Sequence, residues 1–251
     1  MLRGKTIITT QPADQAEELL MLLNAKGADA KNLPMIETRT LVVPAETMKQ
    51  VLLPGNFSLL VFTSKKGVKG FFENLYNLQG NYNLPEKLKL AVVGHTTGKE
   101  LEKHGYVPEF VNPGTDAGDL ANYLLENIHK TGNKILLALS DKAPDYLEKT
   151  LAQKAFVKRI NVYETILLKN VDEDIAGLIK DKRVDMCIFT SPSGFFAFLE
   201  VFGNAGHLKL AAIGSTTAKA IRDCGYDVTV TAPYPSGQSM AKAIEDYFSE
   251  K

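Results

Sequence analysis

Four short segments of the chain place hydroxyl side chains where an apolar run ends and an amphipathic pattern begins. They are Thr63-Ser64-Lys65, Gly94-His95-Thr96-Thr97, Thr190-Ser191-Pro192-Ser193 and Gly214-Ser215-Thr216-Thr217. A hydroxyl oxygen at the start of a helix can accept hydrogen bonds from the first N–H groups, and these groups and the helix dipole also attract anions. Each segment therefore has two open roles, helix capping alone or contact with a ligand. Four such segments favour a ligand that carries carboxylates or phosphates.

Other kinds of site are absent from the sequence. It contains no Gly-x-x-x-x-Gly-Lys segment, and no Gly-x-Gly-x-x-Gly segment follows the first apolar run, so there is no nucleotide signature. The four histidines lack the spacing typical of metal ligands. No pairing of a cysteine with a histidine indicates a thiol nucleophile. The sequence therefore predicts no metal site.

The elements that position the hydroxyl segments are short apolar runs such as SLLVF, KLAVVG, KILLAL, MCIFT and LAAIG. Apolar runs without alternation are typical of parallel strands that are covered on both faces. Amphipathic stretches separate these runs, which predicts an α/β fold with doubly wound parallel sheets. Ligands of such sheets bind beyond the carboxyl ends of the strands, where all four segments fall.

The chain also resembles itself. Residues 57–72 align with 184–199, and residues 88–120 align with 208–240, where 11 of 33 positions are identical. The offset falls from 127 to 120 because the first copy has about seven additional residues near 76–85, a polar stretch that we expect to form a loop. The chain is therefore predicted to be an internal duplication.

Positions where the copies differ indicate where one copy acquired a separate role. Ile36 in the first copy corresponds to Tyr163 in the second, and Lys65-Lys66 corresponds to Pro192-Ser193. A tyrosine can donate a proton to a leaving group, or it can pack within a strand. The lysines either form a solvated face or contact the carboxylates of a ligand. The residue types leave both pairs of alternatives open.

The composition narrows the class of protein. The 251 residues include 29 Lys+Arg and 29 Asp+Glu, so net charge gives no reason to expect nucleic acid or a membrane surface as a partner. No apolar run is long enough to span a membrane, and the first residues lack a signal-peptide core. Cys187 and Cys224 form no disulfide framework and are expected to be buried thiols. We expect a monomer in the cytoplasm.

In order and spacing, several motifs together resemble the uroporphyrinogen-III synthase family. They are Phe-Thr-Ser at 62–64, Val-Gly-x-Thr-Thr at 93–97, Val-Tyr-Glu-Thr at 162–165, Phe-Thr-Ser-Pro-Ser-Gly at 189–194 and Ile-Gly-Ser-Thr-Thr-Ala at 213–218. The resemblance implies two doubly wound parallel-sheet domains of the flavodoxin-like kind, internally duplicated and joined by a two-stranded linker, with the active site in the cleft between them. It assigns residues 1–35 and 169–251 to one domain, residues 42–160 to the other, and residues 35–42 and 161–168 to the linking strands.

The resemblance also implies a reaction. Members of the family close hydroxymethylbilane, a linear tetrapyrrole, with loss of water and inversion of the last pyrrole, which yields uroporphyrinogen III for haem biosynthesis. No cofactor or metal is needed, because the pyrroles supply the electrons once the hydroxyl group leaves. The protein mainly orients the substrate, since unassisted closure gives the uninverted isomer. The implied partners are this substrate and, transiently, the hydroxymethylbilane synthase that produces it.

The family's motifs imply roles for individual residues. Tyr163 matches the catalytic tyrosine that assists departure of the hydroxyl group. The implied substrate-binding residues are Ser64, Lys65, Gly94, Thr96, Thr97, Lys142, Ser191, Pro192, Ser193, Gly214, Thr216 and Thr217. At two places a common arginine of the family is missing, namely at Gln11 and in Ser140-Asp141-Lys142. We expect Lys65, Lys66 and Lys142 to compensate.

Two other functions fit the sequence. A non-catalytic protein with two α/β lobes that close on a small anionic or tetrapyrrole ligand would have the same fold pattern. A degenerate relative that binds a tetrapyrrole without turnover would fit the missing arginines. Tyr163, which breaks the internal symmetry, favours the enzyme.

Overall fold

The computed structural model describes residues 2–114 and 116–249 of the chain. It divides into two compact units. The terminal unit consists of Met1–Glu37 and Ile166–Lys251, and the middle unit consists of Thr38–Thr165. The chain therefore passes between the units twice, within strand β3 (Ile36–Thr40) and strand β8 (Phe156–Leu167).

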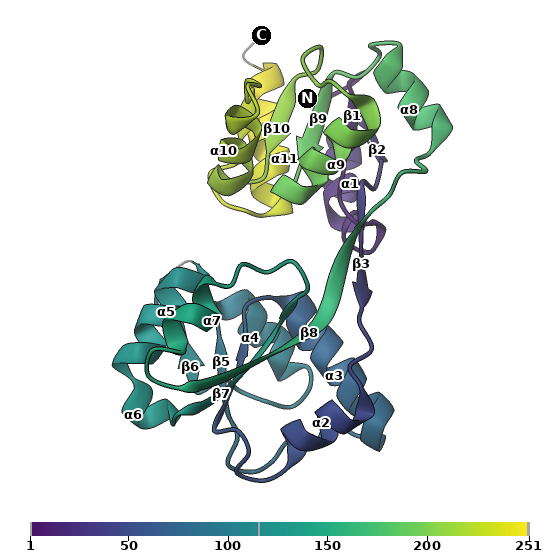
Figure 1. Ribbon diagram of the computed structural model, residues 1–251. Coiled ribbons are helices and arrows are strands. Elements are labelled where there is room, and N and C mark those ends of the chain that lie inside the picture. The colour runs from purple at the N-terminus through teal and green to yellow at the C-terminus, as the bar shows by residue number, and fades with distance from the viewer. Residues whose placement is uncertain (1, 115, 250–251) are drawn as a thin grey trace. The chain divides into compact units, whose positions relative to one another are not determined.

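The terminal unit is built on a five-stranded sheet with the order β11-β10-β9-β1-β2, in which every pairing is parallel (Figure 1). Its elements are β1 (Thr6–Thr9), the 3-10 helix η1 (Ala13–Gln15), α1 (Glu17–Ala25), β2 (Asp29–Asn32), α8 (Glu173–Lys180), β9 (Met186–Phe189), α9 (Pro192–Phe202), β10 (Leu210–Ala212), α10 (Ser215–Asp223), β11 (Val230–Thr231) and α11 (Gly237–Ser249). Numbered along the chain, these strands have the 2-1-3-4-5 order of flavodoxin-like sheets.

Helices cover both faces of this sheet because the side chains of each strand alternate between two hydrophobic cores. Ile7 and Ile188 pack on the face that α1 and α11 cover. Ile8 and Phe189 pack on the opposite face, against α8, α9 and α10. A strand that is buried on both faces has apolar side chains at successive positions instead of alternating apolar and polar ones. This explains the unbroken apolar runs of the sequence.

The middle unit contains a six-stranded sheet with the order β3-β8-β7-β4-β5-β6. Its remaining elements are α2 (Ala45–Leu52), β4 (Leu59–Phe62), α3 (Lys65–Gln79), β5 (Lys89–Val92), α4 (His95–Glu102), β6 (Phe110–Val111), α5 (Ala117–Glu126), α6 (Ile128–Thr131), β7 (Lys134–Ser140) and α7 (Tyr146–Leu151). Strands β4 to β8 pair in parallel. Leu60 and Phe62 face α3 and α4, whereas Leu59 and Val61 face α5 and α7.

The predicted fold class, α/β with parallel sheets in two domains, is confirmed. Strand order β6-β5-β4-β7-β8 in the middle unit matches β11-β10-β9-β1-β2 in the terminal unit, strand for strand. The internal duplication itself stays a prediction from the sequence. Within the described ranges, 2–114 and 116–249, no helix is long and apolar enough to cross a membrane.

Two local expectations were wrong in part. The polar stretch near 76–85 was expected to be a loop, and residues 80–85 do form one, but α3 continues to Gln79 and ends at Gly80, whose φ is +72°. Polar side chains occupy the exposed side of the last helical turn, so they do not end the helix. Cys187 is buried as expected, but Cys224 is exposed, because it caps the carboxyl end of α10.

Helix α3 approaches the sheet so closely that two of its positions have no room for a side chain. A Cβ atom on Gly67 would lie 2.9 Å from the carbonyl oxygen of Ala138, and one on Gly70 would lie 2.4 Å from that of Val162. In α9, the position that corresponds to Gly70 is the buried Ala197. The backbone of α3 therefore contacts β7 and β8 directly, and the approach of α9 to its own sheet leaves room for a methyl group.

We predict that Gly70→Ala lowers the free energy of unfolding by about 1–3 kcal/mol, because a methyl group would overpack the contact with the Val162 carbonyl. Gly98→Ala is the matched control in α4 of the same unit, where the nearest atom to an added Cβ is Pro108 Cγ at 3.5 Å. That control should be neutral or stabilising by about 0.5–1 kcal/mol. Urea unfolding followed by circular dichroism checks both, and equal stability of the two variants would contradict the close contact.

Candidate functional site

All four hydroxyl segments lie at carboxyl ends of parallel strands. Two of them belong to the middle unit, where Thr63-Ser64-Lys65 follows β4 and Gly94-His95-Thr96-Thr97 follows β5. The other two belong to the terminal unit and follow β9 and β10. Because β4 runs parallel to β5, and β9 parallel to β10, each unit gathers its two segments at one edge of its own sheet, the edge where ligands of such folds bind.

Hydroxyl capping, one of the two open roles, occurs at two of the four segments. The Ser64 side chain accepts a hydrogen bond from the Gly67 N–H at 3.0 Å, and the Ser191 side chain accepts one from the Gly194 N–H at 3.1 Å. Helices α4 and α10 instead have Gly94 and Gly214 as their N-cap residues, which offer no capping side chain. The first N–H groups of α4 and α10 are therefore not satisfied by a side-chain cap, which favours an anion there.

Tyr163 lies on β8 beside the end of β7, at a break in the strand register. Leu139 pairs with Asn161, but Ser140 pairs with Tyr163, so β8 carries one additional residue at this point. Such bulges redirect the side chains around them. The half-buried ring of Tyr163 packs against the core on the α3 side of the sheet.

The Tyr163 hydroxyl group is held by Ser64. The Ser64 hydroxyl donates a hydrogen bond to the Tyr163 oxygen at 3.0 Å, across 99 residues of sequence. This contact joins the predicted catalytic residue with one of the predicted binding residues. Lys65 is exposed beside them, whereas Lys66 donates a hydrogen bond to the Thr38 hydroxyl. Thr96 is exposed and Thr97 is buried at the start of α4.

The predicted residues of the terminal unit surround a cavity of about 420 Å³ at the ends of β9, β10 and β11. Ser191, Pro192, Gly214, Thr216 and Thr217 line it, and Ser193 hydrogen-bonds to Ser191 at 3.1 Å without lining it. Four lining residues, Thr231, Ala232, Pro233 and Pro235, come from the segment after β10 and were missed as site residues. Thr217 lines the cavity although it is only 3% exposed.

The loop after β7 is organised by a residue that the sequence did not single out. The Arg159 guanidinium donates hydrogen bonds to the carbonyl oxygens of Ser140, Asp141 and Ala143, at 2.5, 3.0 and 2.9 Å. These carbonyls are neutral, so they orient the cation without neutralising it. Lys142 is exposed in this loop. A cation therefore lies under the loop that lacks the family's arginine, although it comes from the neighbouring strand.

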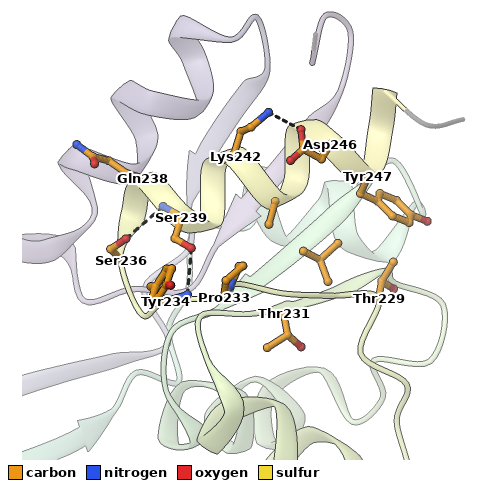
Figure 2. Close-up of a pocket in the computed structure, with 12 residues that line it drawn as sticks. Thr229, Thr231, Pro233, Tyr234, Ser236, Gln238, Ser239, Lys242, Asp246 and Tyr247 are labelled. Atoms are coloured by element: carbon orange, nitrogen blue, oxygen red, sulfur yellow. Dashed lines mark hydrogen bonds and ion pairs between the residues drawn. The ribbon is translucent and has the colours of Figure 1, made fainter.

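A larger hollow, of about 740 Å³, lies between β11 and α11 and contains none of the predicted residues (Figure 2). It shares only Thr231 and Pro233 with the smaller cavity. Lys242 and Asp246 form an ion pair at 2.6 Å on its wall. The Ser239 hydroxyl oxygen accepts a hydrogen bond from the Tyr234 N–H at 3.1 Å. These polar groups of the wall therefore already have partners within the protein.

In the part of the chain that the structure describes, no group of three or more His, Cys, Asp or Glu side chains could hold a metal ion. Burial raises the pKa of the Cys187 thiol, which keeps it neutral and unreactive. His95, in a hydroxyl segment, is exposed.

Comparison with known proteins gives a consistent assignment. A family model described as Uroporphyrinogen-III synthase HemD matches residues 17–242. The uroporphyrinogen-III synthase of Chlorobaculum parvum is 27% identical over 258 aligned residues, which cover 96% of this chain and 98% of that protein. Two crystal structures share the fold. A mutant uroporphyrinogen III synthase from Thermus thermophilus is 19% identical with a TM-score of 0.69, covering 99% of this chain and 100% of its own. The Helicobacter pylori protein, titled uroporphyrinogen-III synthetase, is 21% identical with a TM-score of 0.67, covering 98% and 100%.

We predict that Arg159→Met frees the loop after β7, because three carbonyl oxygens lose their donor while the aliphatic part of the side chain is retained. Backbone amides of residues 141–145 should then exchange with deuterium at least about tenfold faster, a change worth about 1.4 kcal/mol of local stability. Lys158→Met, on the same strand, is the matched control and should leave exchange in this loop unchanged. Unchanged exchange in Arg159→Met would show that the guanidinium does not hold the loop.

Proposed function

Because the chain belongs to the uroporphyrinogen-III synthase family, we propose that it closes hydroxymethylbilane into uroporphyrinogen III, with inversion of the last pyrrole. The substrate loses its hydroxyl group as water, and the terminal carbon then bonds to a pyrrole carbon, which releases a proton. This chemistry makes the protein a cyclising lyase. The pyrroles themselves supply the electrons, so the proposal includes no metal and no cofactor.

The observation that carries the proposal is the pair of hydroxyl groups on Ser64 and Tyr163. Departure of a hydroxyl group is assisted by a proton donor within hydrogen-bond reach. The Tyr163 phenol has such a proton, lies at the carboxyl edge of the middle sheet, and occupies the position that aligns with Ile36 in the first copy. Tyr163 is therefore the proposed catalytic residue.

The substrate carries eight carboxylates, and both units offer groups that suit them. The glycine-initiated helices α4 and α10 present N–H groups without a side-chain cap, and Thr97 and Thr217 stand in their first turns. Lys65 and Lys142 add exposed cations in the middle unit. We assign to substrate binding Ser64, Lys65, Gly94, Thr96, Thr97, Lys142, Ser191, Pro192, Ser193, Gly214, Thr216 and Thr217.

Several wider features belong to the same proposal. Residues 35–42 and 161–168 serve as the linking strands, between a domain of residues 1–35 and 169–251 and a domain of residues 42–160. The protein acts as a monomer in the cytoplasm. Because the bilane is unstable, it receives the substrate by transient contact with hydroxymethylbilane synthase.

The first test supplies hydroxymethylbilane, oxidises the products and measures the ratio of the type III to the type I isomer. We expect the type III isomer from the wild-type protein and a roughly 100-fold lower rate from Tyr163→Phe, which keeps the ring but has no proton to donate. Tyr123→Phe, on α5 of the same unit, is the matched control and should keep the wild-type rate. The type I isomer alone would indicate a non-catalytic binder, and full activity of Tyr163→Phe would remove Tyr163 from its role.

We also predict that Lys65→Ala raises KM about 1.4- to 5-fold at unchanged kcat, because an exposed ion pair with a substrate carboxylate contributes about 0.2–1 kcal/mol. Lys69→Ala removes another exposed cation one turn further along α3 and should have no such effect. The difference should shrink at high ionic strength. Equal KM values for the two variants would place Lys65 on a solvated face.

A further inference from the structure

Ser64 occupies a position where its hydroxyl group has two partners. Its oxygen accepts the Gly67 N–H at 3.0 Å as the cap of α3, and its hydrogen goes to the Tyr163 oxygen at 3.0 Å. A serine hydroxyl has one hydrogen to give, and here that hydrogen is used. The phenol oxygen of Tyr163 therefore accepts, and its own hydrogen must point elsewhere.

The packing around this pair fixes both oxygens. Ser64 is in an extended backbone conformation (φ −158°, ψ 156°), set by its place between β4 and α3. On the other side, the bulge between Leu139 and Ser140 sets Tyr163, and Gly70 lets α3 lie against the carbonyl of the preceding Val162. The hydroxyl–hydroxyl distance thus depends on the close approach of α3 to β8.

The terminal unit provides an internal comparison. Ser191 caps α9 in the same way, but the residue that corresponds to Tyr163 is Ile36, which is buried in the core. Without a phenol to hold, the Ser191 hydroxyl hydrogen-bonds to Ser193 instead. Helix capping is common to both serines, whereas the contact with a tyrosine occurs only in the middle unit. Capping alone therefore does not explain the Ser64–Tyr163 contact.

We infer that Ser64, beyond its proposed place among the binding residues, is a positioning residue, which acts on the reaction by directing the Tyr163 proton toward the substrate. The inference rests on the proposed function. With Ser64 donating to the phenol oxygen, the phenol proton is free for the departing hydroxyl group, which leaves as water. The resulting phenolate keeps the hydrogen bond from Ser64. Tyr163 regains a proton when the attacking pyrrole carbon loses its own.

A double-mutant cycle tests this role. Wild type, Ser64→Ala, Tyr163→Phe and the double variant are compared for kcat and KM of type III formation. Ser64→Ala should lower kcat about tenfold with little change in KM, because the lost interaction acts in the transition state. Tyr163→Phe should lower kcat about 100-fold, and the double variant should be no slower than Tyr163→Phe alone.

Ser64→Thr is the conservative variant, because it keeps both the cap and the donor, and it should restore most of the lost kcat. Ser191→Ala removes the equivalent cap from α9, so its thermal unfolding gives the cost of a lost cap for comparison with Ser64→Ala. A loss of activity in Ser64→Ala that follows only the loss of folded protein would overturn the inference.

The outcomes separate the two claims. If the effects of Ser64→Ala and Tyr163→Phe multiply, to about a 1,000-fold loss, Ser64 acts independently of Tyr163 and only the inference fails. If Ser64→Ala raises KM and leaves kcat unchanged, Ser64 binds substrate and the inference fails again. If the wild-type protein yields only the type I isomer, the proposed function and the inference are both wrong.

Discussion

The direct contact between the backbone of α3 and the strands β7 and β8 is the constraint on which the middle unit depends. It exists because Gly67 and Gly70 have no side chains, and Cβ atoms there would lie 2.9 and 2.4 Å from strand carbonyl oxygens. Protein interiors are close-packed, so such a contact cannot be widened at one point without moving the whole helix. The start of α3 carries Ser64 and Lys65, and β8 carries Tyr163. The distance between helix and strand therefore also sets the distance between the residues proposed to act together.

The parallel direction of neighbouring strands brings the remaining site residues of each unit together. Residues far apart in the sequence, such as those after β4 and β5, reach one edge because these neighbouring strands point the same way. Each edge then combines two kinds of helix start, one capped by a serine and one beginning at a glycine. The capped helices hold their hydroxyl groups in fixed positions, and the glycine-initiated helices leave N–H groups for a ligand. A substrate with many carboxylates needs both kinds, since anion binding and proton transfer have different requirements.

Much of the fold could be predicted from the sequence, because it depends on local pattern. The run at β4 is buried at all four positions, and the serines before α3 and α9 cap those helices. What could not be predicted depends on pairing between distant segments. The bulge at Ser140 appears only once β7 and β8 are aligned, and the role of Arg159 follows from the same alignment. The exposure of Cys224 and the glycine starts of α4 and α10 depend on where each helix ends or begins, which sequence pattern defines least well.

The double passage of the chain between the units has a consequence for its synthesis. The middle unit is continuous in sequence, so all of its strands have left the ribosome soon after residue 165 has been made. In the terminal unit, β1 pairs with both β2 and β9. In the pairing with β9, Ile7 lies opposite Met186. Translation at about 5–20 residues per second leaves β1 without that neighbour for roughly ten seconds or more. During this interval Ile7 and Ile8, which end fully buried, are covered by nothing from the C-terminal half of their own unit. Strand β1 is thus made before β9 but is enclosed only after it, so the sheet of the terminal unit is still incomplete when the middle unit has been synthesised.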